Sequence, residues 1–277
     1  MRAYLREFLS DPRVVELPRL VWLPILHGIV LRSRPAKSAE KYRLVWTPEG
    51  SPLAVHTARQ ARLLSARYAM RYGDPSIGSV LREMKDPLVV PLYPQYSRST
   101  TESVIDVLPK STPVVRDFHD DPGYIRALAA SVEAHWAENG RGELLLMSFH
   151  GLPQRAGDRG DPYQTQCLKT AALLAERLRL PEKGYVVTFQ SRFGAAKWLQ
   201  PYTEPTLVEL ARSGLRRIDV MCPGFVSDCL ETLEEINIGA REAFLHAGGE
   251  AFRYIPCLNE MPEWIEALRA ISVRSSS

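Results

Sequence analysis

The sequence predicts an α/β fold with two Rossmann-like lobes, each a parallel sheet flanked by helices, and a cleft between the lobes. Three observations carry this prediction. Short apolar runs end in Gly, Pro or polar residues, as buried parallel strands do. Amphipathic stretches of ten or more residues separate the runs, which is typical of βαβ units. The units form two series that meet near residues 120–122.

The first series, residues 1–121, is predicted to form the N-terminal lobe. Its expected helices are 1–9, 38–46, 55–66, 77–84 and 101–108. Its expected strands are 67–72, 87–92 and 112–116. The strand at 87–92 is the clearest of them, and a loop rich in hydroxyl groups follows it at 93–101.

The second series, residues 122–258, is predicted to form the C-terminal lobe, with a last helix and tail at 259–277. A long helix is expected to begin with Asp121 as N-cap and Pro122 as its first residue. The expected strands are 144–150, 185–190, 217–221 and 252–256. The other expected helices are 161–178, 204–213, 227–246 and 262–271.

Composition excludes several classes of protein. A net charge of +3 with scattered arginines gives no stripe for nucleic acid. The four cysteines lack C-x-x-C spacing, so neither a zinc site nor a disulfide framework is expected. The expected compartment is a reducing cytoplasm. Met1 precedes a charged amphipathic segment rather than a signal peptide. The apolar run 20–31 is too short to span a bilayer; it is either a lip that rests on a membrane surface or an ordinary half-buried segment.

Polar residues follow three strands of the second series. His150 ends the strand at 144–150, Gln190 and Ser191 end the next, and Cys222 begins the loop after the third. Carboxyl ends of parallel strands share one edge of the sheet, where ligands bind. His150 can therefore move a proton or bind a metal there, or it can simply hydrogen-bond a loop.

An acidic helix face follows the third strand. Asp228, Glu231 and Glu235 have the spacing i, i+3 and i+7, which places them on one side of an α-helix. Acidic residues early in a helix also stabilise its dipole, which is the simpler explanation. If the face points toward His150, the site holds a histidine and carboxylates, which can shuttle protons or bind a divalent cation. Dinucleotide, P-loop and α/β-hydrolase motifs are missing from the sequence.

Several longer motifs resemble the ferrochelatase family over nearly the whole chain, in order, in their proteobacterial form. They are YPQYS at 93–97, STT at 99–101, SFHGLPQR at 148–155, GDPY at 160–163, FQSRFG at 189–194, WLQP at 198–201 and CPGFVSDCLETLEE at 222–235. The resemblance implies a lyase that inserts Fe²⁺ into protoporphyrin IX to form protohaem, the last step of haem biosynthesis. Two alternatives are a porphyrin- or haem-binding relative with impaired catalysis and a chelatase for another tetrapyrrole or metal.

The resemblance also implies roles for individual residues. His150 matches the family's active-site histidine, as proton acceptor or iron ligand, with proton acceptor favoured. Glu231 matches the catalytic glutamate opposite it, so His150 and Glu231 are the expected metal contacts, and Glu235 is the next carboxylate of a relay. The residues that match the porphyrin-lining positions are Tyr42, Ser51, Arg71, Tyr93 and Trp198.

The departures from the family pattern also carry expectations. Cys229 stands where animal enzymes have a second histidine. Arg98 stands where cluster-bearing relatives have a cysteine, so no [2Fe–2S] cluster and no permanently bound cofactor are expected. The family's opening strand and Gly-Thr-Pro loop have no counterpart here, and residues 61–68, 81–88 and 107–114 look shortened. We expect a cytoplasmic monomer that binds protoporphyrin and ferrous iron, binds no nucleic acid and has possible peripheral membrane contact.

Overall fold

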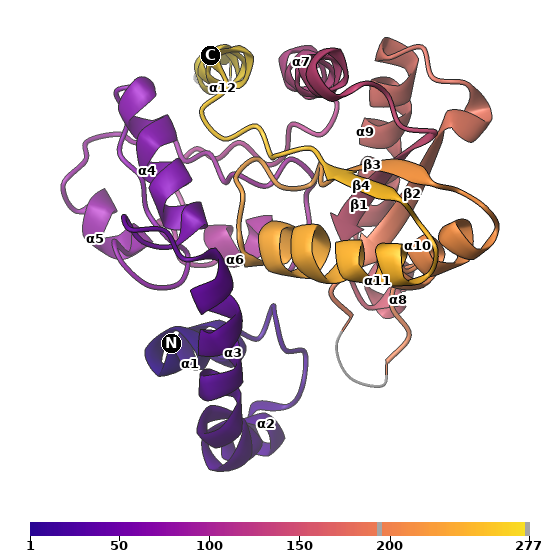
Figure 1. Ribbon diagram of the computed structural model, residues 1–277. Coiled ribbons are helices and arrows are strands. Elements are labelled where there is room, and N and C mark those ends of the chain that lie inside the picture. Colours follow the sequence, from indigo (N-terminus) through magenta and orange to yellow (C-terminus); the bar gives the residue numbers. More distant parts are fainter. Residues whose placement is uncertain (193–195, 275–277) are drawn as a thin grey trace.

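The structure, a computed structural model, describes residues 1–192 and 196–274. Phe193 and Gly194 of the FQSRFG motif therefore lie outside the described residues. One four-stranded parallel sheet dominates the C-terminal half, with strand order β2-β1-β3-β4 (Figure 1). The strands are β1 (Leu144–His150), β2 (Tyr185–Gln190), β3 (Arg217–Met221) and β4 (Ala251–Tyr254). The strands predicted for this half are confirmed, as is the α/β class.

Helices cover both faces of the sheet (Figure 1). On one face lie α7 (Pro122–Asn139), α9 (Tyr163–Arg177) and α12 (Pro262–Arg274); on the other lie α10 (Thr203–Arg212), the π-helix η3 (Glu231–Ala240) and α11 (Arg241–His246). Two short helices, α8 (Gln154–Asp158) and η2 (Glu182–Gly184), complete this half. Successive side chains of a strand point to opposite faces. Met147 packs in the α7 core and Leu146 in the η3 core, so His150 faces η3.

The start of α7 shows how local sequence determines a helix end. Asp121 accepts hydrogen bonds from the backbone N–H groups of Gly123 and Tyr124, at 2.8 and 3.1 Å, and Pro122 occupies the first helical position. Pro has no N–H to leave unsatisfied there, and its fixed φ suits a helix. The predicted N-cap is thus confirmed. Helix α12 lies beside α7 and shares its apolar core through Trp264.

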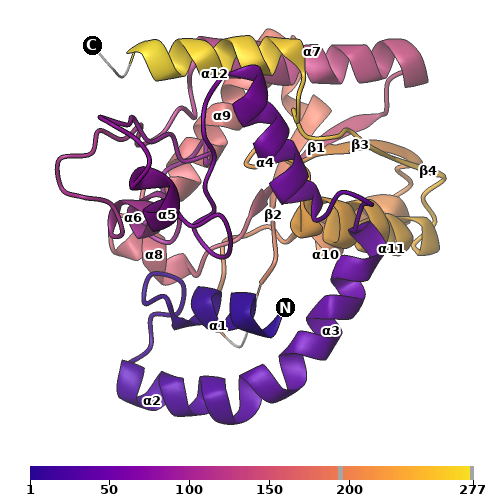
Figure 2. The ribbon, with the colours of Figure 1, turned by 90° about the vertical axis from the view of Figure 1, so that its left-hand side faces the viewer.

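The N-terminal half is mainly helical. A curved arm consists of α1 (Arg2–Ser10), α2 (Arg19–Ile25), the π-helix η1 (Leu26–Val30) and α3 (Leu31–Val45), and Figure 2 shows α2 and α3 bending around α1. Leu5, Leu9, Leu26 and Leu31 form its small apolar core. Beyond the arm lie α4 (Pro52–Leu63), α5 (Ile77–Leu81) and α6 (Thr101–Ile105). In the described ranges no helix is long and apolar enough to cross a membrane.

The strands predicted at 67–72, 87–92 and 112–116 are reduced to isolated bridges. Val89 and Val114 form a parallel bridge, in which the N–H of Val89 donates to Pro113 and the N–H of Val115 donates to Val89, both at 3.0 Å. Proline has no N–H to donate, and prolines at 87, 91 and 113 interrupt a longer ladder. The expected contact between these segments is present, but among the described residues the N-terminal half forms bridges rather than a full sheet.

A buried ion pair holds the arm onto the rest of the N-terminal half. Asp11 accepts from the Arg71 guanidinium at 2.6 Å, from the Tyr72 hydroxyl at 2.8 Å and from the Ser103 hydroxyl at 2.6 Å. The Arg71 side chain is only 17% exposed. An Asp11→Ala substitution leaves this charge without its partner, and we expect it to lower the free energy of unfolding by about 3 kcal/mol in urea titrations.

Arg13→Ala is the matched control for that substitution. Arg13 pairs with Asp106 at 2.7 Å on the surface, where removal of an ion pair costs less than ~1 kcal/mol. Equal losses in the two variants would contradict the structural role of Asp11.

Candidate active site

His150 lies at the carboxyl end of β1, and the backbone carbonyl of the next residue decides which of its ring nitrogens carries a proton. The Nδ1 atom is 2.7 Å from the carbonyl oxygen of Gly151. A carbonyl only accepts hydrogen bonds, so in the neutral ring Nδ1 carries the proton and Nε2 has the lone pair. The sequence also allowed a histidine that merely hydrogen-bonds to its own loop, and this is true of Nδ1 but not of Nε2. Nε2 has the lone pair that a proton or a metal ion requires.

Glu231 begins the π-helix η3, on the face of the sheet to which His150 points. Three tyrosines from the N-terminal half lie near its carboxylate. Burial, followed by the negative charge of Glu231, raises the pKa of Tyr42 to about 12. Burial and the same charge also raise the pKa of Tyr93. The carboxylate therefore lies close enough to these phenol groups of the N-terminal half for its charge to affect them.

Tyr4, on α1, is the third of these tyrosines, and sequence reasoning did not identify it. Burial is the largest cause that raises its pKa, followed by Tyr42 and Glu231. The Tyr42 phenol is therefore a close neighbour of the Tyr4 phenol, and both are buried beside the charge of Glu231. The available signal was weak: Tyr4 and Phe8 are spaced i, i+4 and stack, which resembles ordinary packing.

Glu235 is held by the loop after β2. Ser191 donates to the Glu235 carboxylate twice, from its backbone N–H at 2.7 Å and from its hydroxyl. The Ser191 backbone has φ of 65°, in the left-handed region, which turns the N–H toward η3. A cavity of about 170 Å³ opens beside this carboxylate. Its lining includes Gln190, Ser191, Arg192, Tyr202, Glu204 and Glu235.

The expected face of three carboxylates is wrong for Asp228. This side chain is buried and accepts hydrogen bonds from Tyr254, Thr232 and Asn259, at 2.5, 3.0 and 2.7 Å. The prediction assumed one α-helix over 227–246, but a π-helix with i→i+5 hydrogen bonds begins at Glu231. Asp228 lies before that helix, in the loop that follows β3, and its hydrogen bonds stabilise the fold there.

The remaining predicted residues divide by their contacts. Trp198 packs beside the histidine loop, since its Cε3 would lie 3.4 Å from a Cβ on Gly151. Ser51 caps α4 by accepting from the backbone N–H of Ala54 at 3.3 Å. Arg71 forms an ion pair with Asp11. Its charge also acts on Tyr93, where it opposes the larger effect of burial, which raises the pKa of that phenol.

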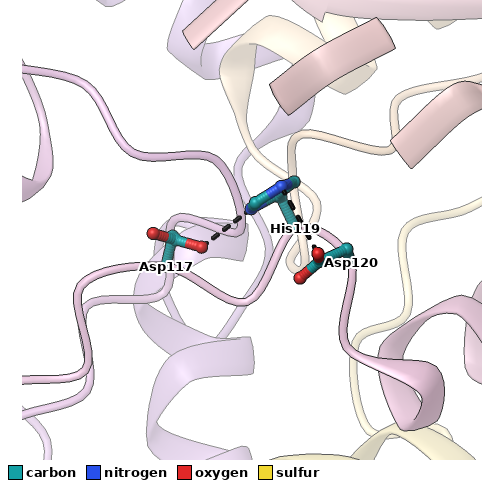
Figure 3. Close-up of side chains that lie close together, drawn as sticks. All are labelled: Asp117, His119 and Asp120. Carbon is teal, nitrogen blue, oxygen red and sulfur yellow. Dashed lines mark hydrogen bonds and ion pairs between the residues drawn. The ribbon is translucent and has the colours of Figure 1, made fainter. Parts of the chain in front are cut away.

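A second group of possible metal ligands lies in the loop before α7. Asp117 approaches Nδ1 of His119 at 2.7 Å, and Asp120 approaches Nε2 at 3.8 Å (Figure 3). Figure 3 shows the two carboxylates on opposite sides of the ring. The hydrogen bond from His119 lowers the pKa of Asp117. Both ring nitrogens have a carboxylate neighbour from the same loop, so these three side chains hold the loop together through contacts among themselves.

The chain is similar to curated ferrochelatases over almost its full length. The family model described as ferrochelatase matches residues 1–276. The ferrochelatase of Methylibium petroleiphilum is 58% identical over 99% of this chain and 82% of its own length. That of Azoarcus sp. is 56% identical over 97% of this chain and 80% of its own. The first of these alignments spans 299 positions, more than the 277 residues here, so the relative has internal residues that this chain lacks.

Solved structures with the same fold are more distant. SirB from Bacillus subtilis with Fe³⁺ has a TM-score of 0.54 at 13% identity, covering 81% of this chain and 88% of SirB. CbiX, described as the terminal enzyme of sirohaem biosynthesis in denitrifying bacteria, has a TM-score of 0.52 at 16% identity, covering 86% and 93%. At these identities the likeness concerns the fold alone. From its sequence relatives, the chain belongs to the ferrochelatase family, and it is a lyase that inserts iron into a porphyrin.

Proposed function

We propose that this chain inserts Fe²⁺ into protoporphyrin IX to form protohaem, with His150, Glu231 and Glu235 as its catalytic groups. The observation that carries this proposal is the hydrogen bond from Nδ1 of His150 to the Gly151 carbonyl. It leaves Nε2 as a proton acceptor or metal ligand on the face of the sheet where η3 places Glu231.

The reaction needs a proton acceptor because two pyrrole N–H bonds break as iron–nitrogen bonds form. Two protons leave for each Fe²⁺ that enters, and the iron stays ferrous. Nε2 of His150 takes a proton from the macrocycle, as a general base within reach of its substrate does. Glu231 stabilises the incoming cation by its charge, and Glu235, four residues on, passes protons away from the site.

Aromatic and phenolic side chains form the proposed porphyrin wall. Tyr42 and Tyr93 lie near Glu231, and Trp198 packs beside the His150 loop. Rigid rings of this kind suit a flat apolar substrate and can hold it in a strained shape. Ser51 and Arg71 complete the proposed wall, although each also supports the fold: Ser51 caps α4, and Arg71 pairs with Asp11.

The cellular setting is also a proposal. We infer a cytoplasmic monomer that takes Fe²⁺ as a substrate, binds no nucleic acid and has neither a permanently bound cofactor nor a [2Fe–2S] cluster. Peripheral membrane contact is supported by the outer side of α2 and η1. Leu20 there is 92% exposed, and Val21, Ile25 and Ile29 are exposed beside it. Exposed apolar residues gathered in this way are typical of a surface that contacts a membrane or another protein.

Anaerobic mixing of the purified protein with Fe²⁺ and protoporphyrin tests the function directly. We expect the absorption spectrum of haem to appear with saturation in both substrates. Coproporphyrin and Co²⁺, assayed in parallel, identify a different tetrapyrrole or metal preference. Quenching of porphyrin fluorescence without metal insertion would contradict the proposal and indicate a binding protein.

A further inference from the structure

Gln190, the last residue of β2, joins three elements of the site through one buried amide. Its side-chain Nε2 donates to the backbone carbonyl of Glu231 at 2.8 Å. Its Oε1 accepts from the Ser148 hydroxyl on β1 at 2.7 Å and from the Cys222 thiol after β3 at 3.6 Å. The residue is 4% exposed. The amide therefore lies beneath the site, between the strand that carries His150 and the helix that carries Glu231.

The orientation of the amide follows from its partners. The Glu231 carbonyl can only accept a hydrogen bond, so the nitrogen must face it, while hydroxyl and thiol hydrogens face the oxygen. A flipped amide would place two acceptors against each other in a buried site, where such a mismatch is costly. One arrangement of the Gln190 side chain thus satisfies both of its ends.

The backbone of the same residue holds the histidine loop. Gln190 and His150 are partners in the β1–β2 register, and the N–H of Gly151 donates to the Gln190 carbonyl at 2.7 Å. A Cβ at Gly151 would lie 2.7 Å from that oxygen, so the close approach needs glycine. The Gly151 carbonyl is the group that directs Nδ1 of His150. Gln190 therefore contacts both the loop that orients His150 and the residue that supplies the carboxylate.

We propose that Gln190 is a positioning residue that sets the place of the Glu231 backbone relative to the His150 ring. The inference rests on the proposed function, because it assumes that these two groups act on one substrate. It assigns no direct contact with porphyrin or iron to Gln190. Since misplacement of reacting groups by about 1 Å can cost ~10²-fold in rate, a tether of this kind has catalytic consequences.

Gln190→Met removes the donor and the acceptor while keeping the length of the side chain. We expect kcat for haem formation to fall about tenfold or more, with KM for protoporphyrin changed less than ~2-fold, because only the alignment of catalytic groups is lost. Thr188→Val is the matched control. Thr188 lies two residues earlier on the same face of β2, is fully buried and receives a hydrogen bond from Thr203 at 2.9 Å. Among the described side chains, Thr188 is joined to Gln190 only through Thr203 and Ser148. This variant loses a buried hydrogen bond of the same network but keeps the direct bond from Gln190 to the Glu231 carbonyl, and its kcat should stay native.

Gln190→Glu gives a readout that a simple loss of packing would not give. A protonated glutamic acid can donate its O–H to the Glu231 carbonyl, whereas an ionised one cannot. Burial raises the pKa of such a carboxyl, so the protonated form persists toward neutral pH. We therefore expect the kcat of this variant, divided by that of the native protein at the same pH, to be highest at low pH and to fall as the carboxyl ionises.

The outcomes separate this inference from the proposed function. Native kcat in Gln190→Met, or a Gln190→Glu rate ratio that does not change with pH, would overturn the positioning role. A native protein that forms no haem would overturn the proposed function instead. The crystal structure of Gln190→Met tests the positioning role without an activity measurement. A displaced Glu231 backbone would support that role, and an unmoved one would overturn it.

Discussion

Haem formation by a His150→Ala variant is expected to be at least ~10²-fold slower than by the native protein, since a positioned general base contributes on that scale. The reason is the tautomer that the Gly151 carbonyl requires of the neutral ring. Because Nδ1 is tied to the Gly151 carbonyl, Nε2 has the only basic lone pair of the imidazole. Alanine removes it and leaves the pyrrole protons with water as their acceptor. Stopped-flow or steady-state absorption of haem measures the loss.

Porphyrin binding separates this loss of catalysis from a loss of the site. Quenching of porphyrin fluorescence by His150→Ala should give a dissociation constant close to the native one. His246→Ala, at an exposed position on the last turn of α11, is the matched control and should keep native kcat. Turnover at the native rate in His150→Ala would refute the assigned mechanism.

Chemical rescue distinguishes a base from an iron ligand at the same position. If His150 accepts a proton, added imidazoles should restore part of the rate to His150→Ala, and the restored rate should rise with the pKa of the added base. Rescue that follows metal affinity instead, with no dependence on basicity, would assign His150 to iron binding.

Glu231→Gln is the second substitution with a large expected effect. The amide keeps the shape of the side chain and leaves the backbone carbonyl that Gln190 holds, but it removes the negative charge of the carboxylate. We expect kcat to fall by about 10²-fold, because a fixed charge in a partly dry site stabilises a transferred cation more strongly than water does. The pKa of Tyr42, raised by burial and by this charge to about 12, should decrease in the variant. A difference titration of tyrosine absorbance measures that change.

The neighbouring glutamate is the control for that experiment. Glu234 belongs to the same helix, but its carboxylate pairs with Lys41 of α3 at 2.9 Å. Glu234→Gln removes an equal charge from η3 and should keep kcat within ~2-fold, with a stability loss below ~1 kcal/mol. If both variants lost activity to the same extent, the effect would belong to the charge of the helix rather than to Glu231.

Local patterns were enough to predict the elements that hold the site. The apolar run of β1, the N-cap at Asp121 and the alternation of strands with long helices each depend on neighbouring residues alone. They placed His150 at the carboxyl end of a strand, whereas the position of the Glu231 helix relative to it stayed conditional. The prolines that limit the pairing at Val89 to a single bridge were visible in the sequence too, but a full strand was expected there.

Only the tertiary structure decided how the side chains of the site are used, since that depends on contacts between residues far apart in the chain. Asp228 shares the expected spacing with Glu231 but turns to Tyr254. Tyr4 joins the site because the arm folds back toward η3, which no local periodicity encodes. Arg71 is bound by Asp11, sixty residues earlier.

The sequence by itself determined the family, the parallel sheet and the place of His150 at its edge, because short-range hydrophobic patterns and contiguous motifs carry that information. Packing decided which nitrogen of the histidine is available and which amide holds the Glu231 backbone. The physical reason is that buried donors and acceptors must find partners. The Gly151 carbonyl and the Gln190 amide became those partners only when the strands and η3 came together.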